Sequence, residues 1–229
     1  MDEAAIVVAL RRCALFGTVA DEALLRVART LRRRRFRRGE VIFHEGDPGD
    51  ALHVVAAGSV KIALESEDGT EAILVTLGPG ESFGELALLD GSPRSASAVA
   101  VEPTETLALG RGALRELMSA DDGLRDALLA GVATALRRLT NQMAELHFLD
   151  LGGRLAVRLA RLARVKDPTA SSVTLDWPYT QSDLAAMIGG TRQSVNRLLN
   201  QLVDDGLVRI EEDTLVITDV NALLLAGER

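Results

Sequence analysis

The sequence has few of the residues that disulfide, cluster and metal chemistry require. Its 229 residues include a single cysteine, Cys13, which excludes an internal disulfide and a four-cysteine iron–sulfur cluster. The three histidines, His44, His53 and His147, lie far apart and show none of the close spacings typical of zinc ligands. No nucleophile stands beside a base in a recognisable motif. We therefore expect neither an enzyme nor a bound metal or cofactor.

Long apolar runs are also missing. No stretch approaches the ~18–20 uncharged apolar residues of a membrane-spanning helix, so we expect no membrane partner. The acidic start Met1-Asp2-Glu3 is unlike a secretory signal, and together with the lone cysteine it favours the cytoplasm. Acidic residues outnumber basic ones by 33 to 26, and the net charge of −7 argues mildly against a nucleic-acid ligand.

What is present falls into three patterns along the chain. Residues from about 4 to 30 carry apolar side chains at helical spacing, which returns from Arg111 to Arg164. Between about 36 and 110, short β-branched runs alternate with Gly, Pro and Asp, and Asp68-Gly69 between two runs predicts a hairpin. Many short strands of this kind indicate a sandwich or barrel. The expected strands include residues 41–43, 52–56, 60–64, 72–77 and 106–109.

The second helical region contains a heptad seam. Its members recur every three or four residues and are Leu128, Val132, Ala135, Leu139, Gln142, Leu146 and Leu149. Such a seam predicts a long helix that pairs in parallel with a copy of itself. A second stripe, Leu129, Leu136 and Met143, predicts packing on the chain's own sheet, and a helix that only covers its own domain is the alternative. Leu151-Gly152-Gly153 predicts a hinge where the long helix ends.

Residues 83–98, FGELALLDGSPRSASA, hold the parts that a sugar-phosphate ligand needs. Gly84 lets the N–H groups of Glu85 and Leu86 approach an anion. Arg94 supplies a forked, charged donor for phosphate oxygens, and Glu85 can accept a hydrogen bond from a ribose hydroxyl. These are the parts of a binding site, and none of them is a catalytic group.

This stretch resembles the phosphate-binding cassette of cyclic-nucleotide-binding domains. Residues 42–58, IFHEGDPGDALHVVAAG, resemble the first signature of that family, in which Gly46-Asp47 and Gly58 shape turns of a β-roll. The alternative is an ordinary glycine-rich turn before an apolar helix. The Arg-Ser-Ala nine residues after the glutamate, and the order of the two motifs, favour the binding domain.

Residues 179–203, YTQSDLAAMIGGTRQSVNRLLNQLV, predict two helices joined by a tight turn. Thr180 with Asp183 predicts the cap of the first helix, Gly189-Gly190 the turn, and Thr191 the cap of the second. This is helix-turn-helix spacing, although an ordinary helical hairpin is the alternative. Strand-like runs at 207–210 and 214–218 predict a β-hairpin wing. The polar face of the second helix has side chains that can contact bases in a major groove: Arg192, Gln193, Asn196 and Arg197.

The order of parts resembles the family of the bacterial cyclic-AMP receptor protein and the fumarate–nitrate-reductase regulator. The resemblance implies an α+β chain: a jelly-roll-like β-roll sensor (1–120), a dimerisation helix (121–150) and a winged helix-turn-helix (151–229). It implies a homodimeric transcription regulator, switched by a cyclic nucleotide, that binds a pseudo-palindromic double-stranded DNA operator and acts with RNA polymerase. A family member that is constitutive or senses another effector is one alternative, and a regulatory subunit of an enzyme is another.

The resemblance also implies the ligand contacts. Ribose and phosphate would be bound by Gly84, Glu85, Leu86, Arg94 and Ser95. Counting back from His147-Phe148-Leu149-Asp150, the two positions that contact adenine in cyclic-AMP receptors are Leu139 and Thr140. Thr140 keeps a hydroxyl and Leu139 does not, while Ser95 could also bond a guanine. Cyclic AMP remains the expected ligand, and cyclic GMP or the use of both nucleotides is the alternative.

On the DNA side, Arg192 and Arg197 match the family's guanine-reading arginines, whereas Gln193 replaces a glutamate. We expect half-sites about 10–11 base pairs apart. The full set of expected DNA contacts is Thr180, Gln181, Ser182, Thr191, Arg192, Gln193, Ser194 and Arg197. The sequence leaves alternative roles for two basic runs. Residues 154–166 are either a solvated face or a phosphate contact, and residues 32–38, RRRRFRR, are a solvated strand edge that DNA or polymerase could reach.

Overall fold

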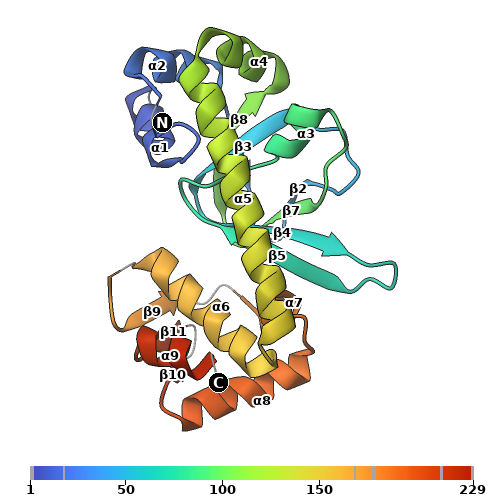
Figure 1. The fold of residues 1–229 in the computed structure, drawn as a ribbon, viewed down its shortest axis with the longest axis vertical. Helices are drawn as coiled ribbons and strands as arrows, with labels where there is room; N and C mark the ends of the chain where they lie inside the picture. Colours follow the sequence, from blue (N-terminus) through green and yellow to red (C-terminus); the bar gives the residue numbers. More distant parts are fainter. Residues whose placement is uncertain (1–2, 18, 168, 177–178, 212–213, 228–229) are drawn as a thin grey trace. The chain divides into compact units, whose positions relative to one another are not determined.

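The computed structural model describes residues 3–17, 19–167, 169–176, 179–211 and 214–227. The chain forms two compact units, residues 1–64 with 74–138 and residues 65–73 with 139–229. Helices come first, short strands follow, a long helix comes next, and helices with a small sheet end the chain (Figure 1). The predicted α+β class and order of parts are confirmed.

The elements have the following bounds. The helices are α1 (Glu3–Arg12), α2 (Asp21–Thr30), α3 (Glu85–Asp90), α4 (Arg111–Ala120), α5 (Asp122–Phe148), α6 (Leu151–Lys166), α7 (Gln181–Ile188), α8 (Arg192–Asp204) and α9 (Val220–Gly227). The strands are β1 (Arg32–Phe36), β2 (Val41–Phe43), β3 (Ala51–Ala57), β4 (Val60–Glu65), β5 (Glu71–Leu77), β6 (Ser82–Phe83), β7 (Ser97–Ala100), β8 (Thr104–Gly110), β9 (Val173–Asp176), β10 (Val208–Glu211) and β11 (Thr214–Ile217).

Two antiparallel sheets form the β-roll, with strand orders β1-β8-β3-β6 and β2-β7-β4-β5. The interior between them is apolar and includes Val55, Val60, Leu77, Phe83 and Ala98. The predicted turn glycines Gly46 and Gly58 have φ of 82° and 78°, values that favour glycine. At Gly58 an added Cβ would also lie 2.5 Å from the carbonyl oxygen of Pro103. Side-chain size and φ therefore both require glycine there.

A second core joins the N-terminal helices to the roll. Its largest buried members come from α1, the turn before α2, α2, β3, β8, α4 and the start of α5, and include Leu10, Phe16, Leu24, Leu52, Leu107, Leu114 and Leu124. Leu128, the first member of the predicted seam, is buried in this core. The second stripe behaves differently from the prediction, because Leu129, Leu136 and Met143 are all exposed. The helix packs on its own domain through Leu124, Ala127 and Leu128 instead.

The long helix ends earlier than the glycines suggested. α5 stops at Phe148, and α6 begins at Leu151, so Gly152 and Gly153 lie inside the first turn of α6. Asp150 caps α6, because its carboxylate accepts a hydrogen bond from the N–H of Gly153 at 2.7 Å. The predicted hinge at 151–153 is therefore wrong, and the break lies at Leu149-Asp150.

The second unit has the predicted helix pair and wing. β10 and β11 pair antiparallel, with Val208 opposite Ile217, and β9 completes the sheet order β10-β11-β9. Glu212 and Asp213, at the predicted wing tip, lie outside the described residues. α9 was not predicted; its first turn is capped by Asp219, whose carboxylate accepts from the N–H of Asn221 at 2.8 Å. Among the described residues, no helix has both the length and the apolar character that crossing a bilayer would take.

Candidate functional site

Gly84 sets the start of the short helix α3. It is the residue before the helix and has φ of 82°, in the left-handed region. An added Cβ at this position would lie 2.5 Å from Nη1 of Arg94. Only glycine therefore lets the backbone and the guanidinium approach each other so closely. Glu85 follows as the first residue of α3 and is half-buried.

Arg94 is a buried cation, with 4% of its surface exposed. Its Nη1 donates to the carbonyl oxygen of Gly84 at 2.8 Å and its Nη2 to that of Ala51 at 2.7 Å. The guanidinium carbon lies 4.0 Å from the ring centroid of Phe43. Within the part of the chain that is described, Nε is buried and has no hydrogen-bond partner. The side chain is thus held in place while its Nε–H is unused.

The groups around Arg94 compensate its positive charge only in part. Burial lowers the pKa of Arg94, and the carboxylates of Asp50 and Asp47 oppose this effect. The Asp50 carboxylate lies 3.5 Å from Nη2 and is exposed on the surface. Burial raises the pKa of Glu85, while the positive charge of Arg94 works in the other direction. A desolvated guanidinium with only partial compensation favours a bound anion such as a phosphate.

An aromatic cluster behind Arg94 was missed in the sequence. His53 is buried on β3 and stacks on Phe83 with centroids 5.1 Å apart, and Phe43 lies 6.1 Å from His53. His53 Nδ1 is 3.1 Å from Oγ1 of Thr106, a hydrogen-bond distance. Burial and the nearby charge of Arg94 lower the pKa of His53 to about 4. A neutral imidazole therefore packs against both phenyl rings at neutral pH, and the two phenyl rings also lie 5.8 Å apart.

The remaining predicted ligand residues lie in more open positions. Leu86 on α3 and Ser95, next to Arg94, are exposed. Leu139 and Thr140 are exposed on α5 and belong to the second compact unit. The first unit therefore brings Gly84, Glu85 and Arg94 together at the start of α3.

The helices α7 and α8 of the predicted helix-turn-helix are capped as predicted. Thr180 Oγ1 accepts from the N–H of Asp183 at 3.1 Å, and the Asp183 carboxylate accepts from the N–H of Thr180 at 2.7 Å. Thr191 and Ser194 repeat this capping box at the start of α8. Gly189 ends α7 with φ of 71°. These local bonds fix where α8 begins and how it follows α7.

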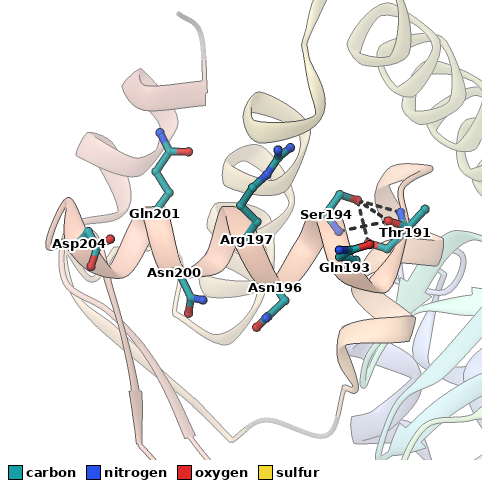
Figure 2. A pocket seen from close by; sticks show the side chains of 8 residues that line it. All are labelled: Thr191, Gln193, Ser194, Asn196, Arg197, Asn200, Gln201 and Asp204. Carbon is teal, nitrogen blue, oxygen red and sulfur yellow. Dashed lines mark hydrogen bonds between the residues drawn. The ribbon is translucent and has the colours of Figure 1, made fainter.

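The outer face of α8 carries an open groove of about 750 Å³. In Figure 2, Arg197 and Gln201 project from one side of this face, and Asn196 and Asn200 project from another. Asn200 and Gln201 were not predicted, and Asn196 had been placed only on the polar face. The lining residues are Thr191, Gln193, Ser194, Asn196, Arg197, Asn200, Gln201 and Asp204. The groove holds amides, hydroxyls, one guanidinium and one carboxylate, groups that can bond base edges and phosphates.

An amide pair links the two helices beside this groove. Gln181, the first residue of α7, donates its Nε2–H to Oδ1 of Asn196 on α8 at 3.0 Å. Each amide therefore has one polar group engaged in this bond and a second polar group outside it. The predicted phosphate contact Gln181 is thus coupled to a second polar side chain on the recognition helix.

The arginines of α6 serve the domain itself. Arg154 donates to the carbonyl oxygen of Ile188 at 2.8 Å, and Arg164 donates to the side chain of Asn221 at 2.7 Å. Arg161 pairs with Glu145. These bonds hold α6 to the end of α7 and to α9. Neither of the two predicted roles for residues 154–166, solvation or phosphate contact, accounts for them.

The arginine-rich run forms β1, the end strand of its sheet. Arg32, Arg33, Arg34 and Arg35 are exposed, and Arg35 donates to the carboxylate of Glu105 on β8 at 3.3 Å. The prediction of a solvated strand edge is confirmed.

Comparison with protein families finds two matches on this chain. Residues 33–121 match the cyclic nucleotide-binding domain, and residues 153–225 match the Crp-like helix-turn-helix domain. The first match includes Arg94 and the whole of α3, and the second includes α7, α8 and the wing.

Individual relatives extend over almost the whole chain. The CRP-like cAMP-activated global transcriptional regulator of Mycobacterium tuberculosis is 34% identical over 217 residues, 93% of this chain and 96% of that protein. The cyclic AMP receptor protein of Thermus thermophilus is 35% identical, covering 91% of this chain and 94% of that protein. Among solved structures, the c-di-GMP responsive global regulator CLP of Xanthomonas campestris has a TM-score of 0.74 at 27% identity, over 86% of this chain and 99% of that one.

Proposed function

The chain belongs to the family of the bacterial cyclic-AMP receptor protein and the fumarate–nitrate-reductase regulator, and we propose that it is a homodimer whose operator affinity is switched by cyclic AMP. It is a cyclic-nucleotide-binding, DNA-binding transcription regulator. We assign the sensor to residues 1–120, the dimerisation helix to 121–150 and the DNA-binding domain to 151–229. It acts in the cytoplasm, with RNA polymerase, and carries no enzymatic activity of its own.

The observation that carries the ligand proposal is the buried guanidinium of Arg94 at the start of α3. The charged exocyclic oxygens of a cyclic nucleotide's phosphate would compensate the positive charge of this desolvated guanidinium. Glu85 accepts from the ribose 2′-hydroxyl, and Gly84, Leu86 and Ser95 complete the contacts to the sugar and phosphate. Leu139 and Thr140 contact the base, with Thr140 supplying the polar contact.

The support for a dimer is the exposed apolar surface of α5. This helix of 27 residues leaves several large apolar side chains exposed, namely Leu129, Leu136, Leu139, Met143 and Leu146. Pairing with a second copy would remove this surface from water. In a dimer, the two α8 helices occupy successive major grooves of a pseudo-palindromic operator, with half-sites about 10–11 base pairs apart. The ligand shifts the angle of the DNA-binding domains at the break Leu149-Asp150, by its differential affinity for the two states.

Calorimetric titration of the purified full chain with cyclic AMP and with cyclic GMP tests the ligand proposal. We expect micromolar or tighter binding of cyclic AMP, weaker binding of cyclic GMP, and loss of binding in Arg94→Ala. Because Arg94 is buried, Ser95→Ala serves as a second variant at an exposed position, with an expected loss of about three- to tenfold from one hydrogen bond. Arg115→Ala, an exposed arginine on α4, is the control and should bind normally.

Selection of operators from random double-stranded DNA tests the second half of the proposal. Bound sequences should form a two-fold symmetric site, and cyclic AMP should raise their affinity at least tenfold at fixed salt. Leu146→Glu should give a monomer by light scattering and abolish operator binding. Saturating cyclic AMP that leaves operator affinity unchanged would refute the switch. Absence of salt-dependent DNA binding would favour an enzyme's regulatory subunit.

A different effector is the second candidate function. The Leu139 side chain offers no hydrogen bond to a base, and one similar structure is of a regulator described as c-di-GMP responsive. The same calorimeter run with cyclic di-GMP discriminates between the candidates. Binding of cyclic di-GMP and of no other nucleotide would identify cyclic di-GMP, in place of cyclic AMP, as the ligand. Absence of binding by any of the three nucleotides would favour a constitutive regulator.

A further inference from the structure

Arg111, the first residue of α4, reaches the cassette helix α3 from outside the phosphate-binding motif. Its Nη2 donates to two carbonyl oxygens, that of Gly49 at 2.7 Å and that of Ala87 at 2.8 Å. Its backbone N–H donates to the carbonyl oxygen of Asp50 at 2.9 Å. Gly49 lies just before β3, and Ala87 lies within α3. One half-buried side chain therefore joins the two segments.

The segments that Arg111 joins are in unusually close contact. A Cβ added to Gly49 would lie 2.2 Å from the Cβ of Ala87, closer than any two such atoms can approach. The glycine thus allows the loop backbone to lie directly on α3. The two hydrogen bonds of Arg111 hold the backbones at this distance.

Arg94 makes a matching link at the residue before α3. It joins the carbonyl oxygens of Gly84 and Ala51, just as Arg111 joins those of Ala87 and Gly49. The two arginines therefore tie the start and the first turn of α3 to the same short segment, residues 49–51. The two side chains differ in burial. Arg94 is almost fully buried and its Nε–H is unused, whereas Arg111 is half-buried.

A phosphate at Arg94 would change this arrangement. Each terminal nitrogen of Arg94 now donates to a backbone carbonyl, and a bound phosphate oxygen competes with these carbonyls for the same guanidinium. This competition would weaken the link between Gly84 and Ala51. The link through Arg111 does not involve the phosphate-binding donors and would persist.

We propose that Arg111 is a positioning residue of the nucleotide site, holding α3 against residues 49–51 while Arg94 binds the phosphate. The role rests on the proposed function of Arg94 as the phosphate ligand. Arg111 also adds a second positive charge near the cassette, which favours an anionic ligand and is kept in Arg111→Lys.

The test uses the full chain and three variants, Arg111→Met, Arg111→Lys and the control Arg115→Met. Arg115 is an exposed arginine one turn further along α4, so its loss removes the same charge without the two bonds. We expect Arg111→Met to weaken cyclic AMP binding about tenfold, as for hydrogen bonds from a charged donor. Arg111→Lys should stay within about threefold of the wild type, because an ammonium can still donate to both carbonyls. Arg115→Met should bind as the wild type does.

Hydrogen exchange without ligand separates positioning from general stability. In Arg111→Met, faster exchange confined to residues 47–51 and 84–91 supports the proposal. Faster exchange across the whole β-roll would overturn it, because Arg111 would then merely stabilise the fold. Wild-type affinity in Arg111→Met overturns this role alone. A wild-type chain that binds no cyclic AMP or cyclic GMP overturns both this role and the proposed function.

Discussion

The guanidinium of Arg94 lies over the ring of Phe43, with its central carbon 4.0 Å from the ring centroid. The ring covers one face of the guanidinium. The N–H groups point outward in the plane of the guanidinium, where two of them donate to backbone carbonyls. Since the π-face attracts a cation and leucine has none, Phe43→Leu removes this support with little loss of apolar volume. We expect cyclic AMP affinity to fall about two- to thirtyfold in calorimetric titration, which corresponds to the ~0.5–2 kcal/mol of such contacts.

Phe36→Leu is the matched control for this change. Phe36 is a half-buried phenylalanine on β1 and loses the same atoms on substitution. It should keep wild-type affinity. Equal losses in both variants would mean that the β-roll is sensitive to any such truncation, and that Phe43 has no special relation to Arg94.

The buried imidazole of His53 makes the β-roll sensitive to acid. Its pKa is lowered to about 4 in the folded chain by burial and by the charge of Arg94, against about 6.5 when exposed. Between these values the unfolded state binds more protons, so stability is present above about pH 6.5 and is lost as pH falls toward 4. From pH 7 to pH 5 this group alone should cost about 2 kcal/mol.

Two measurements check the His53 prediction. NMR titration of the ring should show no protonation down to pH 5. His53→Phe should flatten the pH dependence of unfolding between pH 7 and 5, although its stability at pH 7 falls because buried Thr106 Oγ1 loses its partner. A ring that titrates near pH 6.5 would contradict the burial argument.

Local rules explain why so much of the fold could be predicted. The Thr180–Asp183 capping box, the turn glycines Gly46 and Gly58 and the Asp68-Gly69 hairpin each depend on residues close in sequence. Arg94 was also recognisable, because its spacing from Gly84 belongs to one continuous motif.

Contacts between distant segments explain what could not be predicted. His53 joins the site only because β3 pairs with β6 and β8, which brings Phe83 and Thr106 to it. Arg111 depends likewise on the meeting of α4, α3 and residues 49–51. Nothing local marks either residue as part of the site, since a lone histidine or arginine has many ordinary roles.

Gly152 and Gly153 of α6 differ in their contacts with distant segments, which the sequence does not reveal, and this difference yields a prediction. A Cβ at Gly153 would lie 2.5 Å from the carbonyl oxygen of Gly227 on α9, whereas one at Gly152 would make only ordinary contacts of 3.4 Å or more. Gly153→Ala should therefore destabilise the DNA-binding domain by about 1–3 kcal/mol. Gly152→Ala should be neutral or stabilising by up to about 1 kcal/mol, because alanine favours helix. Thermal unfolding of both variants measures these changes in stability. If residues 152–153 were instead a flexible hinge, both substitutions would alter the cyclic-AMP response of operator binding and would change stability little.

The Gln181–Asn196 amide pair predicts how one base position of the operator is recognised. Gln181 Nε2 donates to Asn196 Oδ1 at 3.0 Å, which leaves the N–H₂ group of Asn196 and the carbonyl of Gln181 outside this bond. Adenine offers a matching acceptor and donor, N7 and N6, at its major-groove edge. Asn196→Ala should therefore relax the preference at one position in each half-site, at a cost of about 1–3 kcal/mol against the preferred base.

Gln181→Ala should relax the same position, because an unpartnered Asn196 amide is free to turn. The control is Ser182→Ala, a neighbouring residue expected to contact phosphate, which should weaken all sequences alike and leave the preferences unchanged. Operator selection followed by competition binding at fixed salt measures both effects. If Asn196→Ala and Gln181→Ala change different positions, the two amides act independently, and if neither changes any position, both contact only the backbone of the DNA.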